Sequence, residues 1–233
     1  MLLPTSMRIF NKLGKALETA LSLPKSFYVS WKLTSFRRAF SLPLTVRYNV
    51  KVLSVSGRFI GPGKMTIGFN RTGIYDVRFQ RSMLNVSGTI EAMGPVSLGG
   101  GCRIDVAVGS TLLFAGKVSN SAGLTIVCGE RIEIGNDTII SWNTLIIDTD
   151  FHYIKDIVSG RTGKMKKPVV IGANTWLCAG SMVLKGAVLP DGCVLSAGSV
   201  LTGRLREKNC LLRGNPAEFV RGNVTRSDIE LNE

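Results

Sequence analysis

The clearest pattern in the chain is an aliphatic residue at every sixth position near the C-terminus. The positions are Ile171, Leu177, Val183, Leu189, Leu195 and Leu201. A small residue stands four positions after each of the first five: Thr175, Ser181, Ala187, Cys193 and Ser199. A period of six is neither helical nor a simple strand alternation. It predicts a short strand followed by a turn, and three such units make a triangular coil of about 18 residues with inward-pointing aliphatics.

The same pattern continues upstream in a weaker form. The spacing of six recurs at Ile134, Ile140 and Ile146. An earlier series, in a different phase, comprises Leu84, Ile90, Val96, Cys102, Val108 and Phe114. Ile60-Gly61 and Ile67-Gly68 read as earlier turns. We therefore predict an all-β solenoid with coils from about residue 50 to 202, and interpret the phase change near 114–126 as a bulge or loop.

Two segments interrupt the repeat. Residues 8–23 have the spacing of an amphipathic helix, whose apolar face comprises Ile9, Leu13, Leu17 and Leu21. This helix could cap the open end of the solenoid or lie on a membrane surface. The second segment, Tyr153–Lys167, is a basic and polar loop that directly follows the only histidine of the chain. We interpret it as a lid or as an arm that contacts a partner.

The positive charge is concentrated at the front of the molecule. Residues 1–82 contain 14 Lys and Arg against two acids, whereas residues 83–233 contain 15 against 14. An anionic partner fits this surface, for example membrane lipid or a phosphate-bearing glycan intermediate, and a merely solvated basic surface is the alternative. Nucleic acid is not expected, because the basic segment lacks a recognised binding motif. Without a signal sequence or a long apolar stretch, we expect a cytoplasmic protein that could act at the inner face of the membrane.

The cysteine and histidine content argues against a metal centre. The five cysteines form no CxxC pair, and the chain has one histidine. A zinc site of the usual Cys/His kind would need more ligands at closer spacing. We interpret the cysteines as small buried apolar residues and expect no metal.

The segment Asp148-Thr149-Asp150-Phe151-His152 carries the candidate chemistry. A nearby carboxylate that holds one imidazole nitrogen fixes the tautomer and makes the other nitrogen more basic. Such a histidine is suited to remove a proton from an attacking hydroxyl. We predict His152 as the catalytic base and Asp150, ahead of Asp148, as the residue that orients it, although either aspartate could instead bind the acceptor.

The C-terminal sequence resembles a known family of enzymes. The run PVVIGANTWLCAGSMVLKGAVLPDGCVLSAGSVLTG, followed by RGNPAEFVRG, is similar to the hexapeptide-repeat acyltransferases, and most to O-acetyltransferases of surface polysaccharides, maltose and galactosides. The resemblance is strong over 130–222, fair from 84 and absent over about the first 50 residues. It implies a left-handed parallel β-helix, a homotrimer with active sites between adjacent prisms, acetyl-CoA as co-substrate, and His152 as the base that acts on the acceptor hydroxyl.

The resemblance also implies where acetyl-CoA and the acceptor bind. The expected cofactor-binding residues are Trp176, Ala179, Gly180, Lys185, Ala197, Gly198, Arg213, Pro216 and Arg221. Small residues among them would let the pantetheine arm approach the backbone, or would simply satisfy tight corners. The cationic ones would meet the CoA phosphates. Trp176 could instead serve trimer packing, and Trp142 and Asn143 are candidates for the acceptor pocket.

Together these observations predict three regions. Residues 1–49 form a basic helical cap, residues 50–222 form the acyltransferase domain, and residues 223–233 form a tail. The expected reaction is O-acetylation of a sugar hydroxyl on a surface-polysaccharide or other glycan intermediate, without an acyl-enzyme. The alternatives are an amino-sugar N-acetyltransferase, which would use the same base and cofactor, and a non-catalytic β-helical scaffold.

Overall fold

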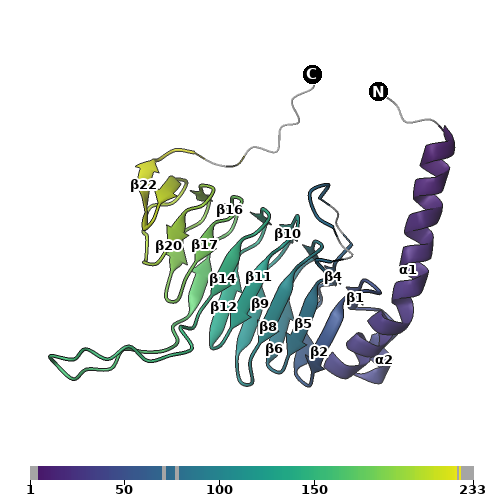
Figure 1. Ribbon diagram of the computed structural model, residues 1–233, viewed down its shortest axis with the longest axis horizontal. Coiled ribbons are helices and arrows are strands. Elements are labelled where there is room, and N and C mark those ends of the chain that lie inside the picture. The colour runs from purple at the N-terminus through teal and green to yellow at the C-terminus, as the bar shows by residue number, and fades with distance from the viewer. Residues whose placement is uncertain (1–4, 70–71, 77–78, 225, 227–233) are drawn as a thin grey trace.

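The computed structural model describes residues 5–69, 72–76, 79–224 and 226, with side chains from residue 13 onward. Figure 1 shows a solenoid of stacked strands with a long helix at one end and a projecting arm near the other. The strands form three parallel sheets, named A, B and C here, and the chain visits them in that order in every coil. The repeat predicted this triangular solenoid, and the family resemblance implied the left-handed parallel β-helix.

Each sheet contains one strand from each successive coil. Sheet A contains β1 (Leu44–Val46), β4 (Met65–Ile67), β7 (Val96–Leu98), β10 (Val118–Asn120), β13 (Thr138–Ile140), β16 (Trp176–Leu177), β19 (Val194–Leu195), β21 (Leu211–Gly214) and the antiparallel β22 (Ala217–Arg221). Sheet B contains β2 (Lys51–Val55), β5 (Met83–Val86), β8 (Arg103–Val106), β11 (Thr125–Cys128), β14 (Leu145–Ile147), β17 (Met182–Val183) and β20 (Val200–Leu201). Sheet C contains β3 (Arg58–Ile60), β6 (Thr89–Ala92), β9 (Thr111–Phe114), β12 (Arg131–Ile134), β15 (Val169–Ile171) and β18 (Val188–Leu189).

The hexad positions form the core, as predicted. The six aliphatic residues from Ile171 to Leu201 are buried, and so are the five small residues between them. Four of the five cysteines are also buried, which confirms their interpretation as small apolar residues, and Cys178 is partly buried. One predicted core position is wrong, because Val108 is 81% exposed. It lies beyond the end of β8, in a turn that includes Gly109 at a φ of 76°.

The phase change in the sequence comes from longer coils and not from the predicted bulge or loop. Arg103 pairs with Thr125, 22 positions later, whereas Met182 pairs with Val200 after 18. The strands on both sides of residues 114–126 remain in continuous register within their sheets. The N-terminal coils therefore lengthen their turns and keep the same triangular section. This is why the period of six fades there.

The N-terminal helix is longer than predicted. α1 spans Thr5–Leu33 and continues through Pro24, and the short α2 (Phe36–Ala39) follows it. The side chains of residues 5–12, Ile9 among them, lie outside the described part of the structure. Solenoid structure begins at Leu44, before the boundary expected at residue 50. Among the described residues, neither helix has the length and apolar content needed to cross a membrane.

Serine side chains of α1 pair with the first strand as a neighbouring strand would. Ser26 Oγ accepts from Val46 N at 3.0 Å and donates to Val46 O at 3.1 Å. Ser30 Oγ does the same with Leu44 N and Leu44 O, at 3.2 and 3.0 Å. The match is geometric, because four helical residues rise about 6 Å and two strand residues about 6.6 Å. The C-terminal half of the helix therefore caps the solenoid, whereas Leu13, Leu17 and Leu21 of the predicted apolar face are exposed.

Two further segments leave the regular coil. A loop between β4 and β5, described at residues 72–76, was not predicted. At the other end, β21 and β22 form an antiparallel hairpin that closes sheet A. Most of the predicted tail, residues 223–233, lies outside the described residues. Arg226, which is described, donates to Asp137 O at 3.0 Å and to its carboxylate at 2.7 Å.

Candidate active site

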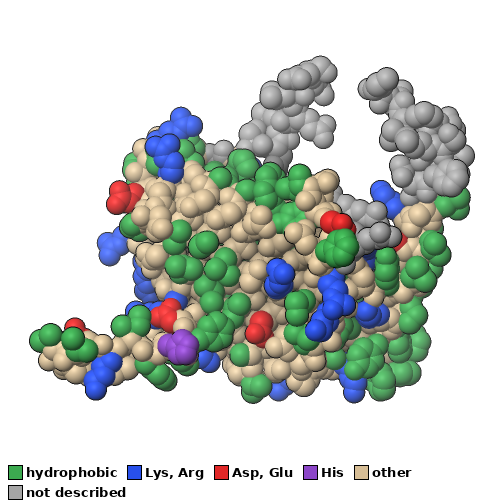
Figure 2. Space-filling model, viewed as in Figure 1, with side chains coloured by type: hydrophobic (Ala, Val, Ile, Leu, Met, Phe, Trp, Pro, Cys, Tyr) green, Lys and Arg blue, Asp and Glu red, His purple; other side chains and the backbone are tan. Residues whose placement is uncertain are grey.

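The histidine of the chain lies at the corner between sheets B and C, the B–C corner. After β14 the chain leaves the solenoid, and it returns at the start of β15. This arm is a hairpin, because Thr149 pairs antiparallel with Lys166, and Lys155 with Thr162. His152 is exposed at its base, where Figure 2 shows the imidazole in purple. The segment predicted to be ejected after His152 is thereby confirmed (Figure 1).

Asp148 anchors the base of the arm. Its carboxylate is fully buried and accepts from the backbone N–H groups of Gly129, Glu130 and Arg131 at 2.6, 2.8 and 2.7 Å. Three such hydrogen bonds hold the carboxylate in one position. Among the described residues, no hydrogen bond joins His152 to Asp148 or to Asp150. The structure therefore gives Asp148 a supporting role in the preceding coil.

Asp150 forms an ion pair with Lys185, which lies at the same B–C corner in the next coil. The Lys185 ammonium also donates to Lys164 O at 2.7 Å, on the returning strand of the arm. The side chain of Lys185 is largely buried by these contacts, with 18% of it exposed. Three segments, the two strands of the arm and the turn before β18, thus meet at one ammonium group. The carboxylate of Asp150 is thus paired with Lys185, and no hydrogen bond among the described residues joins it to His152.

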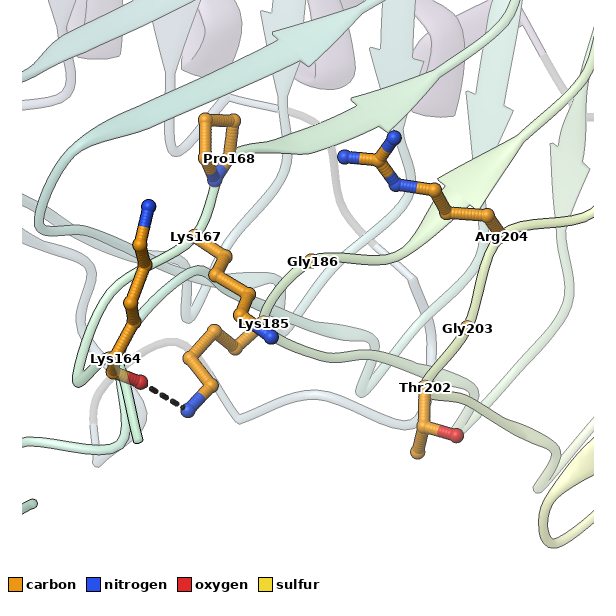
Figure 3. A pocket seen from close by; sticks show the side chains of 8 residues that line it. All are labelled: Lys164, Lys167, Pro168, Lys185, Gly186, Thr202, Gly203 and Arg204. Carbon is orange, nitrogen blue, oxygen red and sulfur yellow. Dashed lines mark hydrogen bonds between the residues drawn. The ribbon is translucent and has the colours of Figure 1, made fainter. Parts of the chain in front are cut away.

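A basic cavity of about 470 Å³ opens beside this ion pair (Figure 3). Its lining residues are Lys164, Lys167, Pro168, Lys185, Gly186, Thr202, Gly203 and Arg204. Four of these side chains are cationic, and backbone from two successive turns supplies much of the remaining wall. Phosphate groups bind well to such clusters of lysine and arginine. Of the predicted cationic ligands only Lys185 is here. The KMKK run that ends the arm was the sequence signal for Lys164 and Lys167, whereas nothing in the sequence marked Arg204.

Phe151 has a backbone conformation that residues with large side chains rarely adopt. Its φ is 60°, in the left-handed region, and its N–H donates to Thr149 Oγ1 at 3.1 Å. An outlier of this kind next to a candidate catalytic residue is a common sign of a constrained functional site. The ring of Phe151 lines a second, smaller cavity of about 240 Å³. Asp105, Cys128 and Met165 contribute to the same cavity, which lies against sheet B.

The cysteine of this second cavity is not suited to act as a nucleophile. Burial raises the pKa of the Cys128 thiol to about 12. Burial also raises the pKa of Cys178, the partly exposed cysteine. The thiolate is the reactive form, so both groups are protonated and unreactive near neutral pH.

The predicted small residues gather at a different corner, between sheets A and B, here the A–B corner. Gly180 and Gly198 each have a φ of 67°, and Asn143 in the previous coil has a φ of 59°. Gly198 N donates to Ala179 O at 2.9 Å, and Gly180 N to Trp142 O at 2.9 Å, so the turns stack directly. The left-handed backbone alone accounts for the two glycines. A Cβ at Gly198 would nevertheless meet no atom within 4 Å. The surface over Gly180 and Gly198, here called the ledge, is therefore also open.

The remaining predicted residues lie on sheet A and its closing hairpin. Trp176 points outward from β16, and its Nε1 donates to Ser141 Oγ at 3.0 Å, towards the A–B corner. Arg213 and Pro216 lie on or between β21 and β22, and Arg221 ends β22. All three are exposed or nearly so, and none lines the basic cavity. Within one chain, therefore, the predicted site residues are divided between two corners and a hairpin.

The unpredicted loop before β5 brings one further residue to the A–B corner. The Tyr75 hydroxyl donates to Asn143 Oδ1, and its ring packs close to Gly101 and Gly123. Both glycines have a positive φ, and a Cβ on Gly123 would lie only 2.2 Å from the Tyr75 oxygen. Tyr75 therefore holds the predicted acceptor residue Asn143 in place. No repeat marks this loop, so the contact could not be predicted from the sequence.

The sequence is similar to that of several known proteins. No family model matches the chain. It is 28% identical over 131 residues to WbbJ of Escherichia coli K12, a protein assigned to lipopolysaccharide biosynthesis as an O-acetyl transferase. It is 30% identical over 122 residues to the galactoside O-acetyltransferase of Lactococcus lactis. These alignments cover 53% and 52% of this chain, but 66% and 58% of the relatives, which is less than two thirds of each.

A solved structure agrees with the architecture. The polysialic acid-specific acetyltransferase NeuO superimposes with a TM-score of 0.52 at 19% identity, covering 82% of this chain and 81% of its own. At this identity the likeness concerns the fold alone. Fold and repeat thus define a hexapeptide-repeat protein of the left-handed β-helix class. The resemblance to O-acetyltransferases expected from the sequence is confirmed, because WbbJ and the galactoside enzyme are named as such.

Proposed function

We propose that this protein is an acetyl-CoA-dependent O-acetyltransferase that modifies a sugar hydroxyl of a surface-polysaccharide or glycan intermediate. One observation carries the proposal. The single imidazole of the chain is exposed at the base of the arm, at the same corner as a cavity with four cationic side chains. Acyl transfer from a CoA thioester to a hydroxyl requires a base near the thioester and a cationic cluster that holds the phosphates.

The basic cavity fits the phosphates of CoA. Lys164, Lys167, Lys185 and Arg204 supply its positive charge, and the volume of about 470 Å³ suits part of a nucleotide. The open ledge at Gly180 and Gly198 suits the narrow pantetheine arm, whose amides would bond to exposed backbone. These two surfaces lie at different corners of one prism. A single acetyl-CoA would reach both kinds of surface where two prisms meet, with one corner from each.

The chemistry assigned to His152 is proton transfer. The neutral imidazole takes the proton of the acceptor hydroxyl as its oxygen attacks the thioester carbonyl carbon. The tetrahedral intermediate then collapses, the C–S bond breaks, and the imidazolium returns the proton to the CoA sulfur. Backbone N–H groups of nearby turns are candidates to stabilise the oxyanion. Direct transfer is favoured over an acyl-enzyme, because burial raises the pKa of Cys128, in the smaller cavity, to about 12.

Two surfaces support assembly into the homotrimer. The outer face of sheet B beside the arm is apolar where polar residues would suit a solvated surface, and includes Val127, Leu145, Ile147 and Met182. At the tip of the arm, Ile157 and Val158 are 95% and 94% exposed. Apolar patches of this kind are typical of interfaces. A trimer would cover both surfaces and bring the two site corners of neighbouring prisms together.

The acceptor assigned here is a glycan, and a lipid-linked intermediate is the form we favour. The two relatives described above are O-acetyltransferases of galactosides and of lipopolysaccharide biosynthesis. A cytoplasmic location with a peripheral contact at the inner face of the membrane would bring the protein to lipid-linked acceptors.

The decisive test is the variant His152→Ala, assayed by release of free CoA thiol with a panel of sugar and amino-sugar acceptors. We expect kcat to fall by about 10²–10⁴-fold while CoA affinity is retained. Lys155→Ala, on the same arm but further from its base, is the matched control and should keep wild-type turnover. Undiminished turnover in His152→Ala would overturn the proposal, and a reaction confined to amines would assign N-acetylation instead.

A further inference from the structure

We propose that α1 and α2 together form a docking surface for an anionic phospholipid bilayer. The inference begins with the two faces of α1. The face towards the solenoid buries Val29 and Leu33. On the same face, the hydroxyls of Ser22, Ser26 and Ser30 bond to backbone groups of the first coil and of α1 itself. The opposite face is apolar and uncovered among the described residues. It exposes Leu13 (63%), Leu17 (62%), Leu21 (54%), Tyr28 and Trp31.

Aromatic side chains extend this apolar face onto α2. Phe36 lies edge-to-face against Phe27, Trp31 and Phe40, with ring centroids 5.8, 5.8 and 5.3 Å apart. Phe36 and Phe40 are themselves more than half exposed. Figure 2 shows the resulting apolar surface at the helical end of the molecule. Tyrosine and tryptophan beside aliphatic residues are the side chains that favour the boundary between lipid headgroups and acyl chains.

The charge around this face selects the occupant. Residues 5–40 contain seven Lys and Arg and one acid, Glu18, which is buried in an ion pair with Arg47. Lys32 and Arg37 are exposed, and the Lys32 ammonium lies 5.5 Å from the centroid of the Trp31 ring. An anionic bilayer satisfies both the apolar stripe and this charge. A second copy of the chain would satisfy only the first, because it would bring two strongly basic surfaces together.

The cap makes this surface rigid, and its position leaves the candidate active site free. The apolar stripe cannot turn inward, because the serine hydroxyls hold the opposite face of α1 against β1. No described residue covers the stripe, which leaves it open to a surface outside the protein. Figure 1 shows α1 at the end of the solenoid opposite to the arm, so bilayer contact would leave the B–C corner at His152 open. The inference does not depend on the proposed acetyl transfer.

The test is co-sedimentation of the full chain with vesicles of equimolar phosphatidylcholine and phosphatidylglycerol, compared with phosphatidylcholine alone. The wild type should bind the anionic vesicles, bind neutral ones at least tenfold more weakly, and dissociate as salt screens the lysines and arginines. The triple variant Leu13→Glu, Leu17→Glu, Leu21→Glu should lose at least tenfold in partitioning. Its circular dichroism should match the wild type, because these side chains are already exposed.

A matched control places the same three charges elsewhere. Leu53→Glu, Ile60→Glu, Val108→Glu also replaces exposed apolar residues, but on the solenoid, and should partition like the wild type. Equal partitioning of the helix variant and the control would overturn the inference. So would a wild type that ignores anionic vesicles while the helix variant alone lowers the molar mass in light scattering, since a second copy would then be the occupant.

Discussion

Lys185 and Asp150 form an ion pair that joins the last coils of the solenoid to the base of the arm. The same ammonium group faces the basic cavity. We predict that Lys185→Met weakens CoA binding by about tenfold or more, because a hydrogen bond to a charged group contributes about 1.5–3 kcal/mol. Isothermal titration with CoA measures this. Lys117→Met, which also removes an ion-paired lysine but lies at another corner, should leave the Kd unchanged; equal effects would contradict the assignment of the cavity.

The partner of that ammonium tests a different role. If Asp150 positions His152, then Asp150→Asn should lower kcat by about 10–100-fold, the usual cost of losing a supporting carboxylate. CoA affinity should not fall, because the Lys185 charge remains and is released towards the cavity. Steady-state kinetics over a range of acetyl-CoA concentrations separates the two parameters. A rise in KM with unchanged kcat would assign Asp150 to cofactor binding.

Replacing Phe151, the left-handed residue before His152, should lower turnover with little effect on stability. In Phe151→Gly, relief of about 1–2 kcal/mol of backbone strain opposes the greater entropy of glycine in the unfolded chain. We expect a free energy of unfolding within about 1 kcal/mol of the wild type, but a kcat at least tenfold lower, because the backbone of His152 is no longer held. Phe151→Asn, which tolerates the same φ, should recover part of the activity. Wild-type kcat in Phe151→Gly would exclude a positioning role.

The ledge at the A–B corner can be tested with a pair of equivalent glycines. Gly198 and Gly109 have φ values of 67° and 76°, and both have open space where a Cβ would stand. Gly198→Ala and Gly109→Ala should therefore cost a similar amount of stability, about 1–2 kcal/mol. Only Gly198→Ala should also reduce the thermal stabilisation that CoA confers. A similar CoA response in both variants would show that the glycine at 198 serves the turn alone.

The helix cap gives a prediction that is independent of catalysis. Ser26→Ala leaves both backbone groups of Val46 unpaired, and Ser30→Ala does the same at Leu44. Each variant should lose about 1–3 kcal/mol in denaturant unfolding, the cost of leaving buried groups unsatisfied. Thr19→Ala removes an exposed hydroxyl from the same helix and should be nearly neutral. Serine variants no less stable than Thr19→Ala would argue that water replaces the hydroxyls.

The sequence predicted the fold where the packing requirement repeats without interruption. From Ile171 to Leu201 each coil has 18 residues, so every inward position returns at the same spacing and the pattern is visible. Upstream, turns of variable length shift the phase, which placed Val108 in the core although it lies in a turn. The predicted helix ended too early, at residue 23, for a related reason. Beyond Pro24 its buried face carries Ser26 and Ser30, which a search for apolar periodicity does not count.

The site was predictable from the sequence only where a reactive residue type occurs once in the chain. A single histidine followed by a break in the repeat indicated His152 and the arm, and both stand out in the structure. The cavity as a whole was not predictable, because Arg204 and the lysines at the end of the arm come from separate segments that only the stacking of turns brings together. The contact of Tyr75 with Asn143 was hidden for the same reason, since 68 positions separate them.

The hydrogen bonds from Ser26 and Ser30 to β1 also determine whether two solenoids can join end to end. A parallel sheet normally presents an unsatisfied edge, which is a template for strands of other molecules. At β1 the groups that point away from the sheet, at Leu44 and Val46, are already occupied by hydroxyls. An incoming strand would have to displace a helix to pair there. Filament growth from this edge of sheet A is therefore blocked by the protein's own first segment.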